Sequence, residues 1–447
     1  MSEIPSSVSV STKIDRIATM SKQMPTTALW SLSKHMDVEW LLEAYQRTRK
    51  DGAPGVDGQS AKEYAKNLES NLRSLLDRAK SGLYRAPAVR RVHIPKGDGG
   101  TRPLGIPTFE DKVLQRAIAM LMEAVYEQDF LDCSYGFRPG RNAHQALGKL
   151  RDTLMDMGGG WIVEVDIRKY FDTIDHKQLN AMLDKRIGDG VVRRLIGKWL
   201  NAGVMEEGEH KRSDSGTPQG GVISPILANV YLHEILDTWF ENEVKPRLRG
   251  KAELIRFADD FVIAFKDEDD ARRVYEVLPK RFEKYGLTLH PEKTRLVPFS
   301  RPSWSDKDDG TTKGSGQGTF DLLGFTLYWA RSARGYWVIQ LKTSRKRFTR
   351  TLLNLTALCR NNRHNAVGKQ WQMIRRKMMG HFAYFCVVGN NSSLLALRRA
   401  VYRIWRNWLN RRSQRSRVTW AKMRLLIERY PLPRLPEPLS LRALAKP

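Results

Sequence analysis

The spacing of hydrophobic and polar positions predicts strands and helices that alternate along most of the chain, followed by a helical region. Helical spacing occurs at residues 37–50 (stopping at Gly52), 60–82 (ending at Gly82), 108–128, 176–187 and 220–240. Strand patterns occur at residues 88–96 and 161–167, in a hairpin at 254–265, and in a second hairpin formed by 320–329 and 336–342 around Gly335. From residue 342 onward the pattern is helical, with breaks near 361–365 and 389–393. The fold class indicated is α/β or α+β.

Other segments lack such periodicity. Residues 1–25 are polar and are expected to be flexible, and "GDGGTRPLGIP" at 97–107 is expected to be a loop. Residues 300–319 are rich in Gly, Ser, Asp and Lys, which predicts a mobile loop. The tail at 430–447 has too many prolines for a continuous helix.

Charge adds a partner to this outline. The 447 residues carry a formal net charge of +27, which indicates a polyanion: nucleic acid first, an acidic membrane second. From Arg331 to Pro447 there are 27 Lys and Arg but only two acids, Glu428 and Glu437, so nearly all of the excess lies in the helical region. A solvated face is the ordinary explanation of a charge run, but one this long and unbalanced favours contact with nucleic acid.

The cysteines and the N-terminal sequence indicate the cellular compartment in which the protein works. Cys133, Cys359 and Cys386 are far apart and form neither a zinc motif nor a disulfide framework, so they are interpreted as buried thiols in a reducing compartment. The first 20 residues lack the apolar core of a signal peptide, and no window is long enough for a membrane helix. A cytoplasmic protein, in the bacterial cytosol or nucleoid, is expected.

Three aspartates carry the candidate chemistry. Asp259 and Asp260 interrupt the apolar stretch "LIRFADDFVIAF", where they also fit an ordinary hairpin tip. Asp166 follows the strand "WIVEV", where it also fits a helix cap. If neighbouring strands bring the three together, each close pair repels by roughly 4 kcal/mol at an effective dielectric of 20, and divalent cations remove that cost. Paired Mg²⁺ ions on carboxylates are the usual arrangement for displacement at phosphorus.

An ordered series of motifs resembles the reverse transcriptases, specifically the bacterial group II intron type. The motifs are "RVHIPKGDGGTRPLGIP", "YGFRPGRNAHQAL", "VEVDIRKYFDTI", "SGTPQGGVISPILANVYL", "RFADDFVIAF", "YGLTLHPEKTRL" and "DLLGFTLYW". The resemblance covers roughly residues 35–430. It implies an α+β right-hand polymerase: fingers, a palm with an antiparallel sheet, and then an all-helical basic thumb.

The resemblance assigns roles to the acidic motifs. It implies that Asp166 and Asp259, assisted by the backbone carbonyl of Ile167, hold two Mg²⁺ ions, with Mn²⁺ able to substitute. Asp260 is the third carboxylate, near the primer end. Phe171 corresponds to the steric gate that excludes the ribose 2′-OH, although a core aromatic is its ordinary alternative.

Further residues are implied to bind the deoxynucleotide. Lys96 and Arg102 flank the glycines of "KGDGGTR" and correspond to finger residues that grip the triphosphate, although "GDGG" alone is more often a turn. Gln219 corresponds to a residue beside the nascent base pair. Lys293 corresponds to a palm lysine near the phosphates, although a surface lysine is the commoner interpretation.

The basic C-terminal region resembles the maturase-specific thumb. Nucleic-acid contacts are expected from arginines interleaved with aromatic residues, namely Arg398, Arg399, Arg406, Arg411 and Arg412. The aromatic residues Tyr402, Trp405 and Trp408 are expected to pack inside the bundle. The predicted domains are an N-terminal extension with a flexible start (1–70), fingers and palm (71–330), thumb (331–430), and a proline-rich tail that is a candidate for residual DNA binding (431–447).

Two departures from the family pattern stand out. Phe257 replaces the usual Tyr, and its lost hydroxyl is expected to tune primer contact or fidelity. The sequence after the thumb shows no paired cysteines or histidine cluster of an HNH nuclease, which resembles endonuclease-lacking, class C-like members.

The predicted function is RNA-directed DNA polymerase and splicing cofactor. Its partners are the structured intron RNA, an RNA template, a DNA primer or target, and dNTPs, with no membrane; the sequence leaves the oligomeric state open. The alternatives are a splicing-only RNA-binding maturase and a domesticated reverse transcriptase in phage defence or DNA repair. Intact carboxylates argue against the first, whereas the active-site residues do not distinguish the second.

Overall fold

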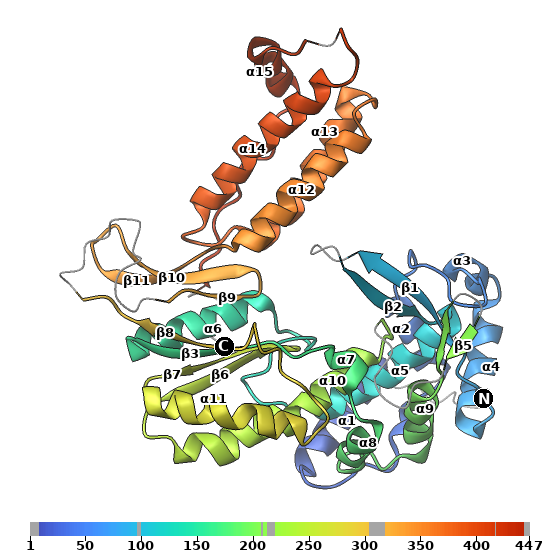
Figure 1. The fold of residues 1–447 in the computed structure, drawn as a ribbon. Helices are drawn as coiled ribbons and strands as arrows, with labels where there is room; N and C mark the ends of the chain where they lie inside the picture. The colour runs from blue at the N-terminus through green and yellow to red at the C-terminus, as the bar shows by residue number, and fades with distance from the viewer. Residues whose placement is uncertain are drawn as a thin grey trace.

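The computed structural model describes residues 9–95, 100–206, 209–211, 220–303, 318–415 and 417–441. Figure 1 shows a long helical arm standing on a broader body of helices and sheets. We use "palm" for the body around strands β3, β6, β7 and β8, "fingers" for the part around β1, β2 and helix α5, and "thumb" for the helices from α12 onward. The observed class is α+β, as predicted.

The palm is built on an antiparallel sheet of order β6-β7-β3-β8. Its strands are β3 (Gly159–Val165), β6 (Ala252–Phe257), β7 (Asp260–Phe265) and β8 (Arg295–Ser300). Successive side chains point to opposite faces. Ile162 and Val262 pack in the core on the side of α6 (Ala143–Met157), whereas Val163 and Phe261 pack on the side of α11 (Glu268–Glu283). The central strands are therefore buried on both faces and give the site a rigid base.

The fingers surround helix α5 (Phe109–Tyr126), most of whose residues are buried. Their sheet has the order β2-β1-β4-β5. Its strands are β1 (Val89–Pro95), β2 (Thr101–Ile106), β4 (Val204–Glu206) and β5 (Glu209–Lys211). The N-terminal helices are α1 (Val10–Gln23), η1 (Leu32–His35), α2 (Val38–Arg47), α3 (Ala61–Tyr64), η2 (Ala65–Asn67) and α4 (Leu68–Ser81).

Further helices connect the fingers and the palm. They are α7 (Tyr170–Thr173), α8 (His176–Asp184), α9 (Gly190–Leu200) and α10 (Ser224–Leu232), followed by η3 (His233–Asp237), η4 (Phe240–Val244) and η5 (Lys245–Arg247). The predicted helix at 220–240 is thus present from Ser224. It continues after Leu232 through π-helical turns, which often mark functional positions.

The prediction of a flexible N-terminus was wrong for the described residues. Helix α1 begins after Ser9, whose side chain accepts a hydrogen bond from the Thr12 amide, and Ile17 is fully buried against the core around α5. Its sequence is too polar to reveal this, because only the contact with α5 shows which face is buried. The N-terminal segment therefore shares a core with the fingers.

Several predicted boundaries also shift. The first predicted helix ends at Arg47, before Gly52, and the second is interrupted at Ala65–Asn67 before ending at Gly82. Part of the predicted 97–107 loop is strand β2, because it pairs with β1. The predicted mobile loop at 300–319 lies largely outside the described residues.

The thumb rises from a sheet of order β11-β10-β9. Its strands are β9 (Phe320–Leu322), β10 (Phe325–Arg331) and β11 (Trp337–Thr343), and its helices are α12 (Arg345–Asn361), α13 (Val367–Phe385), α14 (Asn391–Asn410) and α15 (Trp420–Arg429). The predicted strand at 320–329 is split by a turn at Leu323 and Gly324, both with positive φ. The hairpin around Gly335 is present.

The thumb ends in a segment that returns to its base. Residue 331 is the last of β10, so the helices begin 14 residues beyond the predicted boundary. Residues 431–441 form no continuous helix, as their prolines predict, and the Leu439 amide donates to the Cys386 carbonyl at 2.9 Å. All the cysteines are free and buried, as predicted. Within the described ranges, none of the helices has the length and apolar character needed to cross a bilayer.

Candidate active site

The structure brings the three candidate carboxylates together at one end of the palm sheet. Asp166 directly follows β3, and the β3–β7 register pairs Val165 with Phe261, so its continuation places Asp166 opposite Asp260. Asp259 lies in the two-residue turn between β6 and β7. The stretch "FADD" is therefore a hairpin tip, and the tip points its acids toward the end of a neighbouring strand.

Backbone hydrogen bonds fix the chain around Asp166. Its carbonyl accepts a hydrogen bond from the His290 amide at 2.8 Å, and the Arg168 amide donates to the Thr288 carbonyl at 2.9 Å. Neither bond uses the carbonyl of Ile167, which the resemblance assigns to metal binding. The side chain of Ile167 is buried, so the backbone here is anchored on both sides.

The carboxylates carry an excess of negative charge. Burial and the charges of Asp259 and Asp166 raise the pKa of Asp260 to about 6, although Lys293 and Arg347 act against this. Burial, with a contribution from Asp166, also raises the pKa of Asp259, whereas the charge of Arg102 lowers it. The Lys293 ammonium donates a hydrogen bond to Asp166 Oδ2 at 2.8 Å.

This donor set fits a divalent cation. Carboxylate and carbonyl oxygens are hard ligands of the kind that Mg²⁺ and Mn²⁺ prefer, and a cation would relieve the repulsion that raises the pKa of Asp260. Among the described residues, no group of three or more His, Cys, Asp and Glu side chains is arranged to hold a metal ion. The proposed ligands are instead the side chains of Asp166 and Asp259 and the Ile167 carbonyl, so substrate oxygens would complete the coordination.

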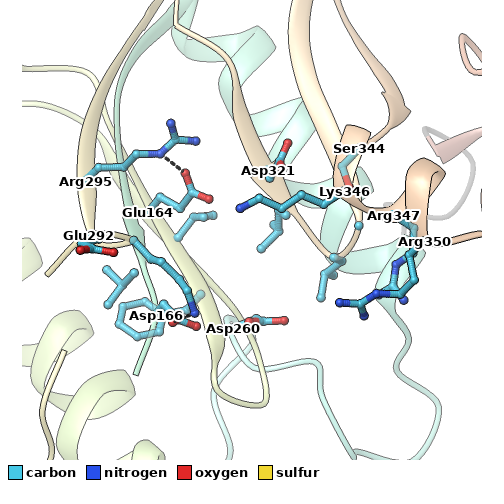
Figure 2. Close-up of a pocket in the computed structure, with 17 residues that line it drawn as sticks. Glu164, Asp166, Asp260, Glu292, Arg295, Asp321, Ser344, Lys346, Arg347 and Arg350 are labelled. Atoms are coloured by element: carbon cyan, nitrogen blue, oxygen red, sulfur yellow. Dashed lines mark hydrogen bonds and ion pairs between the residues drawn. The ribbon is translucent and has the colours of Figure 1, made fainter. Parts of the chain in front are cut away.

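A cavity of about 540 Å³ adjoins the carboxylates. Figure 2 shows Asp166 and Asp260 on one side of it and the first turns of α12, with Lys346, Arg347 and Arg350, on the other. The turn at Leu323 and Gly324 also lines it. The lining residues are Glu164, Val165, Asp166, Asp260, Phe261, Val262, Glu292, Lys293, Arg295, Asp321, Leu322, Leu323, Gly324, Ser344, Lys346, Arg347 and Arg350. Acidic palm thus faces basic thumb across the cavity.

The thumb extends this basic surface. A groove of about 500 Å³ between α12 and α13 is lined by Arg347, Arg350, Arg376 and Lys377, and it shares its first two arginines with the cavity. The sequence prediction missed these residues, since it favoured the arginines of α14. The signal was present in "TSRKRFTR", where four cations fall within six residues directly after the last strand.

The predicted nucleotide-binding residues are only partly described. Lys96 and Gln219 lie outside the described residues. Arg102 lies on β2, exposed, and close enough for its charge to act on Asp259. Phe171 lies on α7, partly buried against the core and partly exposed, which leaves both the gate and the core interpretation open. Lys293 is exposed, as a surface lysine would be, and it also donates a hydrogen bond to Asp166.

The predicted nucleic-acid-binding arginines differ in their surroundings. Arg406 donates to the Val418 carbonyl at 2.9 Å and lies over the Trp420 ring, and Arg412 donates to the Asn365 carbonyl at 3.1 Å. Arg399 and Arg411 are exposed, whereas Arg398 is half-buried. Arg406 and Arg412 therefore also have structural partners. Trp405 is fully buried, and Tyr402 and Trp408 pack partly against the core, as predicted.

Comparisons with known proteins agree with this geometry. Residues 94–327, slightly more than half of the chain, match the family "Reverse transcriptase (RNA-dependent DNA polymerase)". Protein YkfC of Escherichia coli is 39% identical over 259 residues, covering 51% of this chain and 68% of that protein. Group II intron-encoded protein LtrA of Lactococcus lactis is 43% identical over 259 residues, covering 55% of this chain but 42% of LtrA.

The chain belongs to the reverse transcriptase family, and its enzymatic class is RNA-directed DNA polymerase. Similar proteins also include nuclear intron maturase 2 of Arabidopsis thaliana, 28% identical over 231 residues, covering 43% of this chain and 30% of that protein. Because the matches span less than half of LtrA and of the plant maturase, the roles of those whole proteins are taken up only as proposals.

Proposed function

We propose that this protein copies RNA into DNA from a primer seated in the cavity, and that it also binds the structured RNA of a group II intron to assist its splicing and mobility. One observation supports the polymerase assignment above all. Asp166 and Asp260, at the end of the palm sheet, line a cavity whose opposite wall is the basic start of the thumb. Such a site can hold a polyanionic primer end against the metal ligands.

The proposed roles follow from the residues' positions. Asp166, Asp259 and the Ile167 carbonyl would hold two Mg²⁺ ions, which supply activation of an attacking oxygen and charge stabilisation at phosphorus. Asp260 borders the cavity near the primer end. Lys293 holds Asp166 in place and supplies positive charge beside it. Arg102 lies on β2 of the fingers, close enough for its charge to act on Asp259, and would bind the incoming triphosphate there.

Nucleic acid would leave the site along the thumb. The α12–α13 groove continues the basic wall of the cavity, so the template–primer duplex would follow Arg347 and Arg350 away from the carboxylates. No α14 residue lines the cavity or this groove in the described part of the chain. The exposed α14 arginines are therefore available to a second nucleic acid, which supports a separate intron-RNA surface. The buried free cysteines agree with action in a reducing compartment such as the cytoplasm.

Asp259→Ala separates the two proposed activities. Primer extension on an RNA template with Mg²⁺ and dNTPs should fall to background, because the variant loses a metal ligand. Splicing of a group II intron RNA should remain within about twofold, because the thumb is unchanged; a matched Arg399→Ala/Arg411→Ala variant should show the reverse. Equal loss of both activities in Asp259→Ala would contradict the proposed separation.

A further inference from the structure

Arg256 is a fully buried arginine directly behind the candidate catalytic turn. It lies on β6, three residues before Asp259, and its relative exposure is 0%. Removing a guanidinium from water costs free energy, so a buried arginine is found only where an opposite charge and hydrogen-bond partners compensate for the lost water. The surroundings of residue 256 must therefore supply specific partners for an arginine side chain.

The partners of Arg256 satisfy its guanidinium on every side. Asp237 receives it in bidentate geometry, from Nε to Oδ1 at 2.7 Å and from Nη2 to Oδ2 at 2.6 Å. Nη2 also donates to Ser134 Oγ at 2.7 Å, and Nη1 donates to Asn229 Oδ1 at 2.9 Å. Burial alone would raise the pKa of Asp237, but the charge and hydrogen bonds of Arg256 lower it. The pair is thus ionised, fully hydrogen-bonded and shielded from water.

The fifth hydrogen bond reaches the catalytic turn itself. Arg256 Nη1 donates to the Ala258 carbonyl at 3.1 Å, one peptide before Asp259. Ala258 has a φ of 58°, a left-handed conformation that residues with a Cβ rarely adopt. Such a conformation persists only where its surroundings hold it.

A second contact, from Gly136, also holds the turn. A Cβ built on Gly136 would lie 2.2 Å from the Ala258 nitrogen, so the loop "YGF" packs its bare backbone against the turn. Asn229 connects the two contacts, because its Nδ2 donates to the Gly136 carbonyl at 2.7 Å while its Oδ1 accepts from Arg256. The guanidinium, the amide and the glycine form one assembly around the Ala258–Asp259 turn.

We propose that Arg256, held by Asp237, is a positioning residue for polymerisation: its guanidinium locks the Ala258–Asp259 turn so that the carboxylates of Asp259 and Asp260 face Asp166. The inference rests on the proposed polymerase function of this site. Loss of the lock lets the turn leave its left-handed conformation and spreads the metal ligands. Neither the thumb groove nor the cavity wall on α12 changes. Loss of the lock therefore lowers kcat and raises the Mg²⁺ requirement but leaves template–primer affinity nearly unchanged.

The test uses two variants of Arg256 in the full chain. Arg256→Lys keeps the charge and one contact with Asp237 but cannot form the full set of hydrogen bonds. Arg256→Met/Asp237→Leu replaces the pair by apolar residues of similar size, and such a replacement of a buried ion pair often leaves the stability of a protein unchanged. The double variant also removes the hydrogen bond to the Ala258 carbonyl. Together they separate loss of the lock from loss of a buried charge partner.

A control comes from the ion pair between Arg186, which is buried, and Asp129, which is partly buried. Arg186 donates to Asp129 Oδ2 at 2.7 Å and to the carbonyls of Met24 and Ser21, and neither Arg186 nor Asp129 lines the cavity beside the carboxylates. Arg186→Lys and Arg186→Met/Asp129→Leu alter a comparable ion pair without touching the turn. The measurements are kcat, KM for dNTP, the half-saturating Mg²⁺ concentration, template–primer affinity and the thermal midpoint.

We expect both Arg256 variants to lose about 10- to 100-fold in kcat and to need more Mg²⁺, with template–primer affinity kept within about twofold. The Arg186 controls should shift the thermal midpoint but keep kcat. Arg256 variants that keep wild-type kcat and Mg²⁺ dependence, or whose kcat falls only in proportion to folded protein, would overturn the inference. A wild-type chain that extends no primer would instead overturn the proposed function.

Discussion

Asp111 is a buried carboxyl group that links the core of the fingers to the chain after the "TPQGG" motif. It is 1% exposed and accepts hydrogen bonds from the Tyr84 hydroxyl at 2.5 Å, Trp199 Nε1 at 2.6 Å and Gln115 Nε2 at 3.0 Å. Gln115 in turn accepts a hydrogen bond from the Val222 amide at 2.8 Å. The ionisation of Asp111 therefore affects both the stability of the fingers and the chain segment at Val222.

The pKa of Asp111 gives the size of its pH-dependent contribution to the free energy of unfolding. Burial raises the pKa of Asp111 from 3.8 to about 6, even though its hydrogen bonds act in the opposite direction. At 1.36 kcal/mol per unit, the shift corresponds to about 3 kcal/mol. Because the folded state binds the proton more tightly than the unfolded state, the contribution of this group to stability is greatest below pH 4. It is lost as the pH rises to about 6 and stays constant above that.

Asp111→Asn tests this value. The amide keeps an oxygen for Tyr84 and Trp199 but places a donor against Gln115, which should cost about 1 kcal/mol. The variant should therefore be less stable than the wild type by about 1 kcal/mol near pH 4 and more stable by about 2 kcal/mol near pH 7. Urea denaturation followed by tryptophan fluorescence across this range measures the difference. A difference that does not change between pH 4 and pH 7 would refute the reasoning.

Two further predictions concern the site. Phe171→Ala should raise ribonucleotide incorporation by about 10-fold or more, because the ring no longer meets the 2′-OH; unchanged selectivity between dNTP and rNTP in primer extension would favour the core interpretation. Replacing Arg347 and Arg350 together by Ala should weaken template–primer binding and lower the salt slope by about 2, with Arg375→Ala/Arg360→Ala as a control outside the cavity and groove. An unchanged slope in a fluorescence-anisotropy titration would exclude duplex contact along α12.

The comparison of sequence and structure shows which features are local. Strand alternation and the acidic doublet were enough to predict the 254–265 hairpin, since side-chain period and turn chemistry act within a few residues. Helix α1 escaped detection because its polar sequence gives no clear apolar face, although Ile17 and Ser21 are buried against neighbouring elements. The thumb's cavity-facing cations escaped because orientation about a helix axis depends on what the helix packs against.

Arg256 illustrates the same division. Its position in an apolar strand predicts that the arginine is buried. The local sequence does not show its partner, because Asp237 lies 19 residues away on a π-helical turn. Local sequence was enough to predict the candidate carboxylates, the basic region and the strands of the palm. Which groups meet became visible in the folded chain alone, since contacts between distant segments depend on how the sheet and helices pack. These contacts set the charge balance and the shape of the site.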